Sequence, residues 1–234
     1  LRAILNRANA EGVGSVATYP FGRGGFEVSK LEEATAKRYL PAAELSKLKS
    51  ATANNPQCEY ARKLFLFSYY CYGISFIDMA MLTAAHIKQM EDGDYIVYKR
   101  QKIKRQKGVK PISIKITPAI RQLIESLQAA SPTVDDFLLP IVTRSGYTGE
   151  RLYMHIRTRY SKYQKYLRQL AEELGIDFHL TSYVSRHTAA MTLQRNNIPR
   201  EVISQMLGHA DLETTNIYLD SFDNGVINEA AKVL

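Results

Sequence analysis

The chain has 234 residues and 45% of them are hydrophobic, which is enough to bury a core as one large domain or two small ones and which excludes a disordered chain. Lys plus Arg number 31 against 23 for Asp plus Glu, and the net charge of +8 favours a polyanionic partner such as nucleic acid, although such a charge also keeps proteins merely soluble. The longest apolar stretch, residues 64–77, is shorter than the ~20 residues of a membrane span, so no membrane partner is expected.

The two cysteines, Cys58 and Cys71, are too few for a disulfide framework, and both lie in an apolar segment where free buried thiols are common. This usage predicts a reducing, cytoplasmic location. No signal peptide is visible, and the chain begins with Leu1 inside a predicted helix. We therefore expect a fragment from which an N-terminal part has been removed.

The first half of the chain contains residues typical of helix starts. Pro56 follows Asn55 and suits the first turn of a long helix, and Ser75 with Asp78 forms a Ser-x-x-Asp capping pattern. The predicted elements are a helix that ends near Gly12, a linker rich in Gly and aromatic residues at 13–26, a short strand at 28–31, and helices at 41–49, 56–73 and 76–82.

A β-hairpin with a cationic tip is predicted next. Residues 95–98 and 111–114 have strand character and flank a basic, Gly-containing turn at 99–110. Its cations, with one just beyond the second strand, are Lys99, Arg100, Lys102, Lys104, Arg105, Lys107, Lys110 and Lys115. Such a run is most often a solvated face, but a narrow hairpin could also follow a DNA groove and neutralise phosphates, which makes Arg100, Lys104, Arg105 and Lys107 candidate DNA-binding residues.

The rest of the chain is predicted to be helical, with helices at 118–129, 149–174, 182–196 and 199–207 and a last one after Asn224. The fold class is therefore α+β and mostly α-helical, with a small antiparallel β-sheet packed against a helical core. No repeat or low-complexity segment is present.

Helical geometry groups the polar residues of the 182–196 helix. Residues three apart share a face, so Tyr183 and Arg186 are expected to point together and His187 to point elsewhere. The planar fork of Arg186 suits a phosphate oxygen, whereas a structural hydrogen bond is the preferred interpretation of His187.

A fixed turn is predicted after the 199–207 helix. Gly208 suits a left-handed cap that would present His209 to a ligand, although a Gly-His pair is also frequent as a plain cap. Tyr218 lies nine positions later, behind Asp211, which can cap a short helix. This order suits a tyrosine that attacks a phosphodiester with an arginine and a histidine around the phosphate, and no metal site is expected.

Three segments, Leu-Thr-Ser-Tyr-Val-Ser-Arg-His-Thr at 180–188, Leu-Gly-His at 207–209 and Thr-Thr-Asn-Ile-Tyr-Leu at 214–219, resemble the catalytic domain of tyrosine recombinases, the phage integrase family. Residues 65–80 are similar to integrases of conjugative transposons and related mobile elements. The resemblance implies a catalytic domain at 27–223, with residues 1–12 as the last helix of a truncated core-binding domain. A C-terminal helix is expected at 224–234, and its packing on its own domain is the default, whereas the resemblance implies a helix that often docks on a neighbouring protomer.

The resemblance also implies roles for individual residues. Tyr218 would be the nucleophile that forms a 3′-phosphotyrosyl link, Arg186 would stabilise the charge on the phosphate, and His209 would hydrogen-bond the phosphate or assist Tyr218. Arg100-Gln101-Lys102 resembles the family's Arg-x-Lys-Thr strand end, so Lys102 would be the general acid for the leaving 5′-oxygen. No cofactor is implied.

Two departures from the family pattern stand out. Ser75 stands where the family usually has its first catalytic arginine, and Tyr72 where one branch has it; Ser75 also has a structural explanation as a helix cap. We expect Arg186, His209 and Lys102 to compensate for the missing arginine, with a further, unidentified cation as an additional candidate. Tyr183 stands where the family most often has histidine, and its hydroxyl can still donate to a phosphate.

The expected function is site-specific DNA recombination, as integration, excision or inversion. Its partners would be double-stranded DNA, further copies of the chain in a tetramer on paired sites, with a monomer in solution, and an accessory DNA-bending protein. The alternatives are a DNA-binding relative with weak or no catalysis, and a type IB topoisomerase, which shares the phosphotyrosine chemistry but acts as a monomer without site preference.

Overall fold

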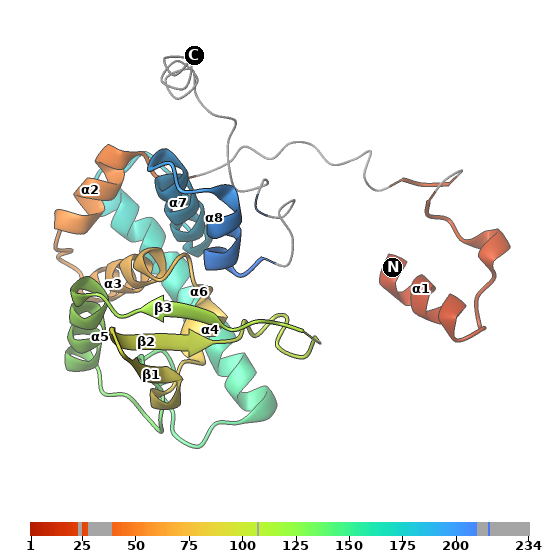
Figure 1. The fold of residues 1–234 in the computed structure, drawn as a ribbon, viewed down its shortest axis with the longest axis horizontal. Helices are drawn as coiled ribbons and strands as arrows, with labels where there is room; N and C mark the ends of the chain where they lie inside the picture. Colours follow the sequence, from red (N-terminus) through yellow and green to blue (C-terminus); the bar gives the residue numbers. More distant parts are fainter. Residues whose placement is uncertain (23–24, 28–38, 107, 210–214, 216–234) are drawn as a thin grey trace, which may run out of the picture. The chain divides into compact units, whose positions relative to one another are not determined.

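The computed structural model describes residues 1–22, 25–27, 39–106, 108–209 and 215, and the chain divides into two units, residues 1–36 and 37–234 (Figure 1). The first unit contains α1 (Arg2–Ala10) and the short 3-10 helix η1 (Val16–Thr18). The predicted strand at 28–31 and the helix after Asn224 lie outside the described residues, and the domain boundary expected near residue 27 stays a prediction.

The second unit is mostly helical and contains a small sheet, which confirms the predicted fold class. Its elements are α2 (Ala42–Ser50), α3 (Pro56–Tyr70), α4 (Phe76–Ala80), η3 (Ala84–His86), β1 (Ile87–Met90), β2 (Gly93–Tyr98), β3 (Ile112–Lys115), α5 (Pro118–Ala130), α6 (Gly149–Glu173), α7 (Ser182–Arg195) and α8 (Arg200–Leu207).

Three helices begin directly after a capping side chain. Asn55 before α3, Ser75 before α4 and Thr117 before α5 each accept a hydrogen bond from a backbone N–H two or three residues further on. This contact satisfies a donor that the first helical turn leaves without an intrahelical partner. The starts of α3, α4 and α5 are therefore set by contacts within three residues along the chain.

The sheet has three antiparallel strands in the order β1-β2-β3, with Ile96 of β2 opposite Ile87 on one side and Ile114 on the other. The predicted hairpin is confirmed as β2 and β3, and β1 adds a third strand that the sequence did not indicate. Only Ile87 of β1 is even half-buried, and Lys88, Gln89 and Met90 are exposed, so its sequence carries little of the alternation that identifies a strand.

Helix α3 lies at the centre of the second unit and contacts α5, α6 and α7 (Figure 1). Leu64, Phe65 and Phe67 on this helix are fully buried, and burial of such side chains contributes about 1.5–3 kcal/mol each. Cys58 and Cys71 are buried and unbridged, as expected, and burial raises the pKa of both thiols. Within the described ranges, no helix combines the length and apolarity of a membrane span.

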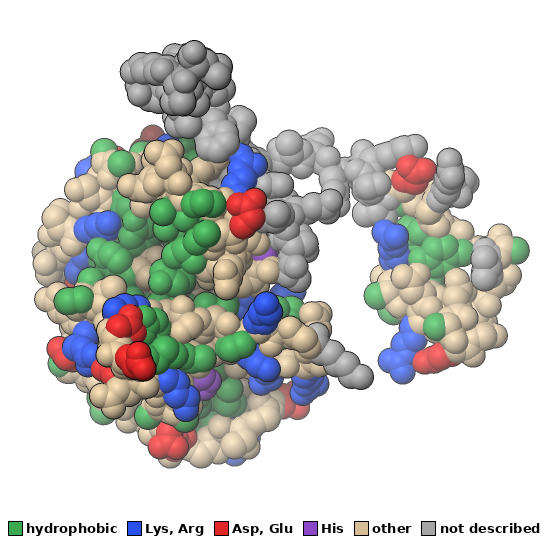
Figure 2. Space-filling model, in the orientation of Figure 1, with side chains coloured by type: hydrophobic (Ala, Val, Ile, Leu, Met, Phe, Trp, Pro, Cys, Tyr) green, Lys and Arg blue, Asp and Glu red, His purple; other side chains and the backbone are tan. Residues whose placement is uncertain are grey.

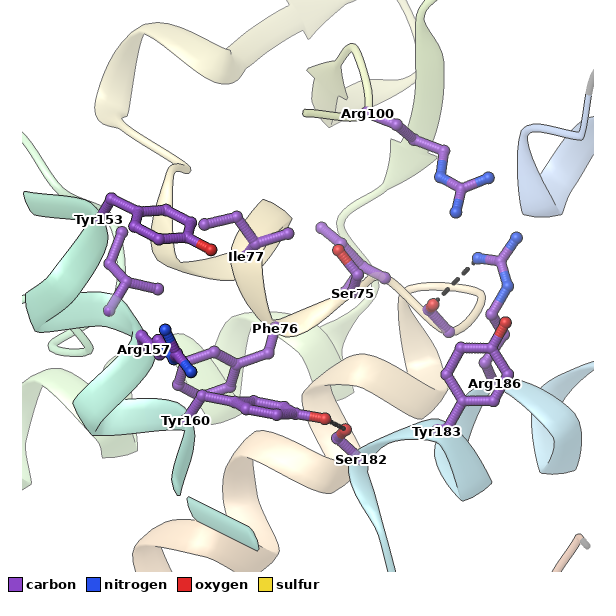
Figure 3. A pocket seen from close by; sticks show the side chains of 13 residues that line it. Ser75, Phe76, Ile77, Arg100, Tyr153, Arg157, Tyr160, Ser182, Tyr183 and Arg186 are labelled. Atoms are coloured by element: carbon purple, nitrogen blue, oxygen red, sulfur yellow. Dashed lines mark hydrogen bonds between the residues drawn. The ribbon is translucent and has the colours of Figure 1, made fainter. Parts of the chain in front are cut away.

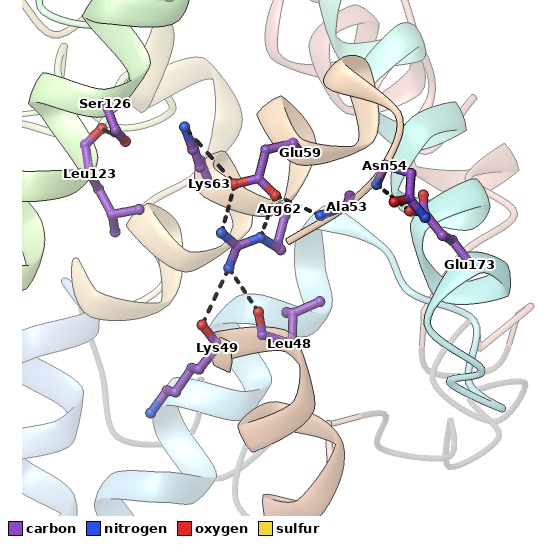
Figure 4. A network of polar contacts seen from close by, with 10 residues as sticks. All are labelled: Leu48, Lys49, Ala53, Asn54, Glu59, Arg62, Lys63, Leu123, Ser126 and Glu173. Carbon is purple, nitrogen blue, oxygen red and sulfur yellow. Dashed lines mark hydrogen bonds and ion pairs between the residues drawn. The ribbon is translucent and has the colours of Figure 1, made fainter. Parts of the chain in front are cut away.

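A polar network joins α2 to α3 (Figure 4). Arg62 donates two hydrogen bonds of 2.7 Å to the carboxylate of Glu59 and a third of 3.0 Å to the carbonyl oxygen of Leu48, and the backbone N–H of Ala53 also donates to Glu59. Burial alone would raise the pKa of Glu59, but the hydrogen bonds from Arg62 and Ala53 and the charges of Arg62 and Lys63 outweigh it, so the pKa is lowered from 4.5.

Glu59→Gln is expected to lower the free energy of unfolding by about 1–3 kcal/mol at pH 7, since it breaks charged hydrogen bonds in a mostly buried pair. A carboxylate whose pKa is lowered by folding stabilises the protein above its unfolded pKa, and this contribution is lost as the pH falls through the folded value. The difference from wild type should therefore shrink below pH 4.5. Urea unfolding of both proteins at several pH values measures this difference.

Glu44→Gln is the control, because it removes an exposed ion pair with Lys47 and should lower the free energy of unfolding by less than about 1 kcal/mol. An equal loss in both variants would contradict the stabilising role of the Glu59–Arg62 pair.

Candidate active site

A cavity of about 380 Å³ lies where the start of α4, the first half of α6 and the start of α7 meet the end of the β2 strand (Figure 3). The polar side chains that line it are Ser75, Arg100, Arg157, Ser182, Tyr183 and Arg186. Phe76, Tyr153 and Tyr160 form an aromatic wall. Among the described residues, the lining therefore combines three guanidinium groups with apolar surface and includes no carboxylate.

Arg186 of α7 is 5% exposed, and its guanidinium is held from two sides. Nη1 donates to the carbonyl oxygen of Gly73 at 3.1 Å, and Nη2 donates to that of Leu207 at 2.5 Å and to Nε2 of His209 at 2.8 Å. Gly73 ends the turn after α3 and Leu207 ends α8. The fold therefore fixes this cation at the meeting point of three helices before any ligand binds.

Gly73 allows the close approach of Arg186. Its φ of +72° is in the left-handed region, and a Cβ atom there would lie 2.4 Å from Cα, 2.5 Å from Cβ and 2.6 Å from Cγ of Arg186. No side chain fits at these distances. Gly73, which was predicted to end a helix, thus also places its carbonyl oxygen against the guanidinium of Arg186. The sequence did not indicate this contact.

His209 follows α8 on the sharp turn predicted from Gly208, whose φ of +64° is left-handed. Because an arginine side chain can only donate, Nε2 of His209 accepts from Arg186, and Nδ1 then carries the proton and donates to Oγ1 of Thr215 at 2.8 Å. Thr215 is fully buried. Both ring nitrogens of the imidazole are therefore engaged in hydrogen bonds that orient the ring, which is an arrangement typical of a catalytic histidine.

Tyr183 and Arg186 line the same cavity, as their helical spacing predicts. Tyr183 is 56% exposed, and its ring contacts His187 edge-on with 5.2 Å between centroids. His187 is not among the residues that line the cavity. As expected, Tyr183 and Arg186 thus share one side of α7, at the cavity, and His187 does not line it.

Ser75 has both of its hydrogen-bonding roles occupied within α4. Its hydroxyl donates to Oδ2 of Asp78 at 2.6 Å and accepts from the backbone N–H of Asp78 at 3.2 Å. The other carboxylate oxygen, Oδ1, accepts from the backbone N–H of Gln101 at 2.7 Å. Asp78, which is 4% exposed, therefore ties the start of α4 to the chain immediately after Arg100.

The cations of the hairpin separate into two kinds. Lys102, Lys104 and Arg105 are exposed on the turn that follows β2, and Figure 2 shows Lys and Arg side chains gathered around this part of the unit. Arg100 is half-buried instead, lines the cavity and donates from Nη1 to the carbonyl oxygen of Gly208 at 3.2 Å. Lys102 is not in the cavity lining, and Lys107 lies outside the described residues.

The buried phenol of Tyr98 lies close to Arg100 and Arg186. Burial raises the pKa of Tyr98, the charge of Asp78 raises it further, and Arg186 and Arg100 act in the opposite direction. The two guanidinium groups are thus near enough to influence the same buried hydroxyl.

Tyr218 lies outside the described residues, so its predicted place beside Arg186 and His209 is not tested by the geometry. Within the described parts of the chain no cluster of three or more His, Cys, Asp or Glu side chains could hold a metal ion. The site that can be described is therefore a cationic cavity, and one of the arginines that line it, Arg186, contacts the oriented imidazole of His209, which is itself not in the lining. This arrangement suits a phosphate group.

Comparison with protein families gives a match between residues 38–224 and the model of the phage integrase family. Among curated proteins, the tyrosine recombinase XerD of Halalkalibacterium halodurans is 44% identical over 54 residues, which are 23% of this chain and 18% of that protein. The tyrosine recombinase XerC of Rhodospirillum centenum is 30% identical over 114 residues, 49% of this chain and 31% of that protein. The matched regions thus span about a third or less of these relatives.

Among solved structures, the Tn1549 transposon integrase in complex with a circular intermediate DNA superposes with a TM-score of 0.61 at 12% sequence identity, covering 100% of this chain and 76% of that one. At this identity the likeness concerns the fold. Together with the family match, it agrees with the mostly helical architecture and small antiparallel sheet described above.

Proposed function

Because this chain belongs to the phage integrase family, we propose that it cleaves and rejoins duplex DNA at a specific site through a covalent phosphotyrosyl intermediate. The observation that carries the proposal is the buried Arg186 guanidinium, which lines the cavity and is held against the oriented imidazole of His209. The related proteins named above are recombinases, and the Tn1549 structure contains DNA.

In the proposed reaction, the hydroxyl oxygen of Tyr218 attacks the scissile phosphorus and loses its proton. The bond from phosphorus to the 5′-oxygen breaks, a 3′-phosphotyrosyl link forms, and the leaving 5′-oxygen takes up a proton to become a hydroxyl. An incoming 5′-hydroxyl reverses these steps and joins a new strand, so the energy of the phosphodiester is conserved without a cofactor.

Arg186 supports this chemistry by position. A pentavalent transition state carries extra negative charge on the non-bridging oxygens, and a cation fixed beforehand stabilises it without reorganisation. Two backbone carbonyls already fix Arg186. We propose that the hydroxyl of Tyr183 hydrogen-bonds the same phosphate, and that Lys102 reaches the leaving oxygen from the exposed turn after β2. His209 would join them through Nε2 once this atom takes up a proton and gives up its contact with Arg186.

The proposed partner is double-stranded DNA, which agrees with the net charge of +8 and the exposed cations of the hairpin. Arg105, Lys104 and Lys107 are proposed to contact phosphates along the duplex. A tetramer on paired sites, docking of residues 224–234 on a neighbouring copy and an accessory DNA-bending protein complete the proposal, which places the protein at DNA inside the cell.

The proposal is tested by covalent trapping. The protein is incubated with a nicked duplex of its recombination site, from which the short cleaved strand diffuses away, and the products are separated on a denaturing gel. We expect a DNA–protein adduct that Tyr218→Phe does not form, with a nucleotide-linked peptide that contains Tyr218 after digestion. Tight DNA binding without any adduct would instead support a DNA-binding relative that lacks catalysis.

A further inference from the structure

Two arginines from distant parts of the sequence converge on one turn of the chain. Arg186 donates to the carbonyl oxygen of Leu207, and Arg100 donates to that of Gly208, the next residue. Figure 3 shows both guanidinium groups directed to the same end of the cavity. That end of the cavity is thus lined by two planar cations, which are held by the turn that presents His209.

The position of Arg100 is fixed from both sides. The hydrogen bond from Gln101 N–H to buried Asp78 anchors the backbone immediately after it, and the bond to Gly208 anchors the guanidinium. A Cβ atom on Gly208 would lie 2.4 Å from Cδ1 of Ile112 and 3.3 Å from Cδ of Arg100, so the glycine leaves room for the side chain of Ile112 and, less tightly, for that of Arg100. An arginine held in this way differs from the exposed cations of the same hairpin.

Ser75 lines the same cavity but is not available as a phosphate donor, because its hydroxyl proton is engaged by Asp78. The same carboxylate that engages Ser75 anchors the residue after Arg100. Asp78 therefore occupies the hydroxyl of Ser75, which stands at the first-arginine position. The same carboxylate also holds the backbone next to Arg100, whose guanidinium lines the cavity.

We propose that Arg100 is a catalytic residue, which supplies the second phosphate-clamping guanidinium that Ser75 cannot provide. Arg100 and Arg186 bind the two non-bridging oxygens of the scissile phosphate and stabilise their charge in the transition state. The inference rests on the proposed recombinase function. It assigns to Arg100 a role in the rate of cleavage, in contrast to the general phosphate binding expected from Lys104.

The first test compares Arg100→Ala with Lys104→Ala, an exposed cation of the same turn. With protein in excess over the nicked duplex, Arg100→Ala should lower the rate of adduct formation by about 10²–10³-fold, as expected for loss of one preorganised donor, while DNA affinity changes only a few-fold. Lys104→Ala should weaken DNA binding and reduce its salt dependence. Arg100→Lys should recover only part of the rate, because an ammonium cannot bind two oxygens with a planar fork.

A second measurement separates charge neutralisation from a structural role. A methylphosphonate at the scissile position replaces one charged oxygen by a methyl group, so an arginine that neutralises this charge is less needed. The defect of Arg100→Ala relative to wild type should therefore be at least ten-fold smaller on the methylphosphonate duplex. An equal defect on both duplexes would show a structural role and overturn the inference.

The outcomes also distinguish this inference from the function on which it rests. Absence of an adduct with the wild-type protein would overturn the proposed function. An adduct that wild type and Arg100→Ala form at the same rate would leave that function intact and overturn only the role of Arg100.

Discussion

Arg186→Ala is expected to lower the rate of covalent cleavage by at least 10²–10³-fold, measured as adduct formation on the nicked duplex with protein in excess. The reason is electrostatic preorganisation, because the guanidinium is fixed by the carbonyl oxygens of Gly73 and Leu207 and needs no rearrangement as charge develops on the phosphate. Its loss also removes the hydrogen bond that orients Nε2 of His209, so two proposed catalytic groups are affected by one change.

The same substitution is expected to destabilise the protein by about 1–3 kcal/mol, since buried carbonyl oxygens lose a charged donor. The cleavage assay must therefore be carried out below the melting temperature of the variant, which a thermal unfolding curve supplies. Arg195→Ala is the matched control, because Arg195 is an exposed arginine at the other end of α7, where it contacts the ring and hydroxyl of Tyr39. A similar rate loss in both variants would contradict the role of Arg186.

Much of the fold follows from local signals in the sequence. The capping residues Asn55 and Ser75 locate the starts of α3 and α4, and Gly208 locates the left-handed end of α8. These features depend on contacts within a few residues, so they are visible without the tertiary structure. Strand β1 was missed because its pairing with β2, rather than its own pattern, makes it a strand.

The site is less predictable, because its geometry depends on contacts between distant segments. Gly73 and Arg186 are 113 residues apart, and Arg100 and Gly208 are separated by 108. One signal for Arg100 was nevertheless present. Ile96 and Tyr98 are buried, and the two-residue period of β2, continued two residues beyond its end, predicts Arg100 on the same face; in the structure Arg100 is half-buried and Lys99 is exposed. The alternation could have separated this arginine from the solvated cations of the tip.

Gly73→Ala is expected to reduce both stability and cleavage. A left-handed φ costs a non-glycine residue roughly 1–2 kcal/mol, and the added Cβ would overlap Cα, Cβ and Cγ of Arg186 at 2.4–2.6 Å, where overpacking typically adds about 1–3 kcal/mol. Because the overlap falls on the start of α7, relief by displacement of that helix would move Arg186 away from Leu207 and His209. The rate of adduct formation should therefore fall by about 10²-fold, which is the effect of a 1 Å misplacement of a catalytic group.

Gly146→Ala is a closely matched control for this change. Gly146 has the same φ of +72°, but a Cβ atom there would meet nothing within 4 Å, so this variant carries the backbone cost without the steric one. Thermal unfolding and adduct formation are measured for both variants. We expect Gly146→Ala to lose stability through the backbone alone and to cleave at the wild-type rate. If Gly73→Ala matched it in both measurements, the close approach of Gly73 to Arg186 would not be what positions the guanidinium.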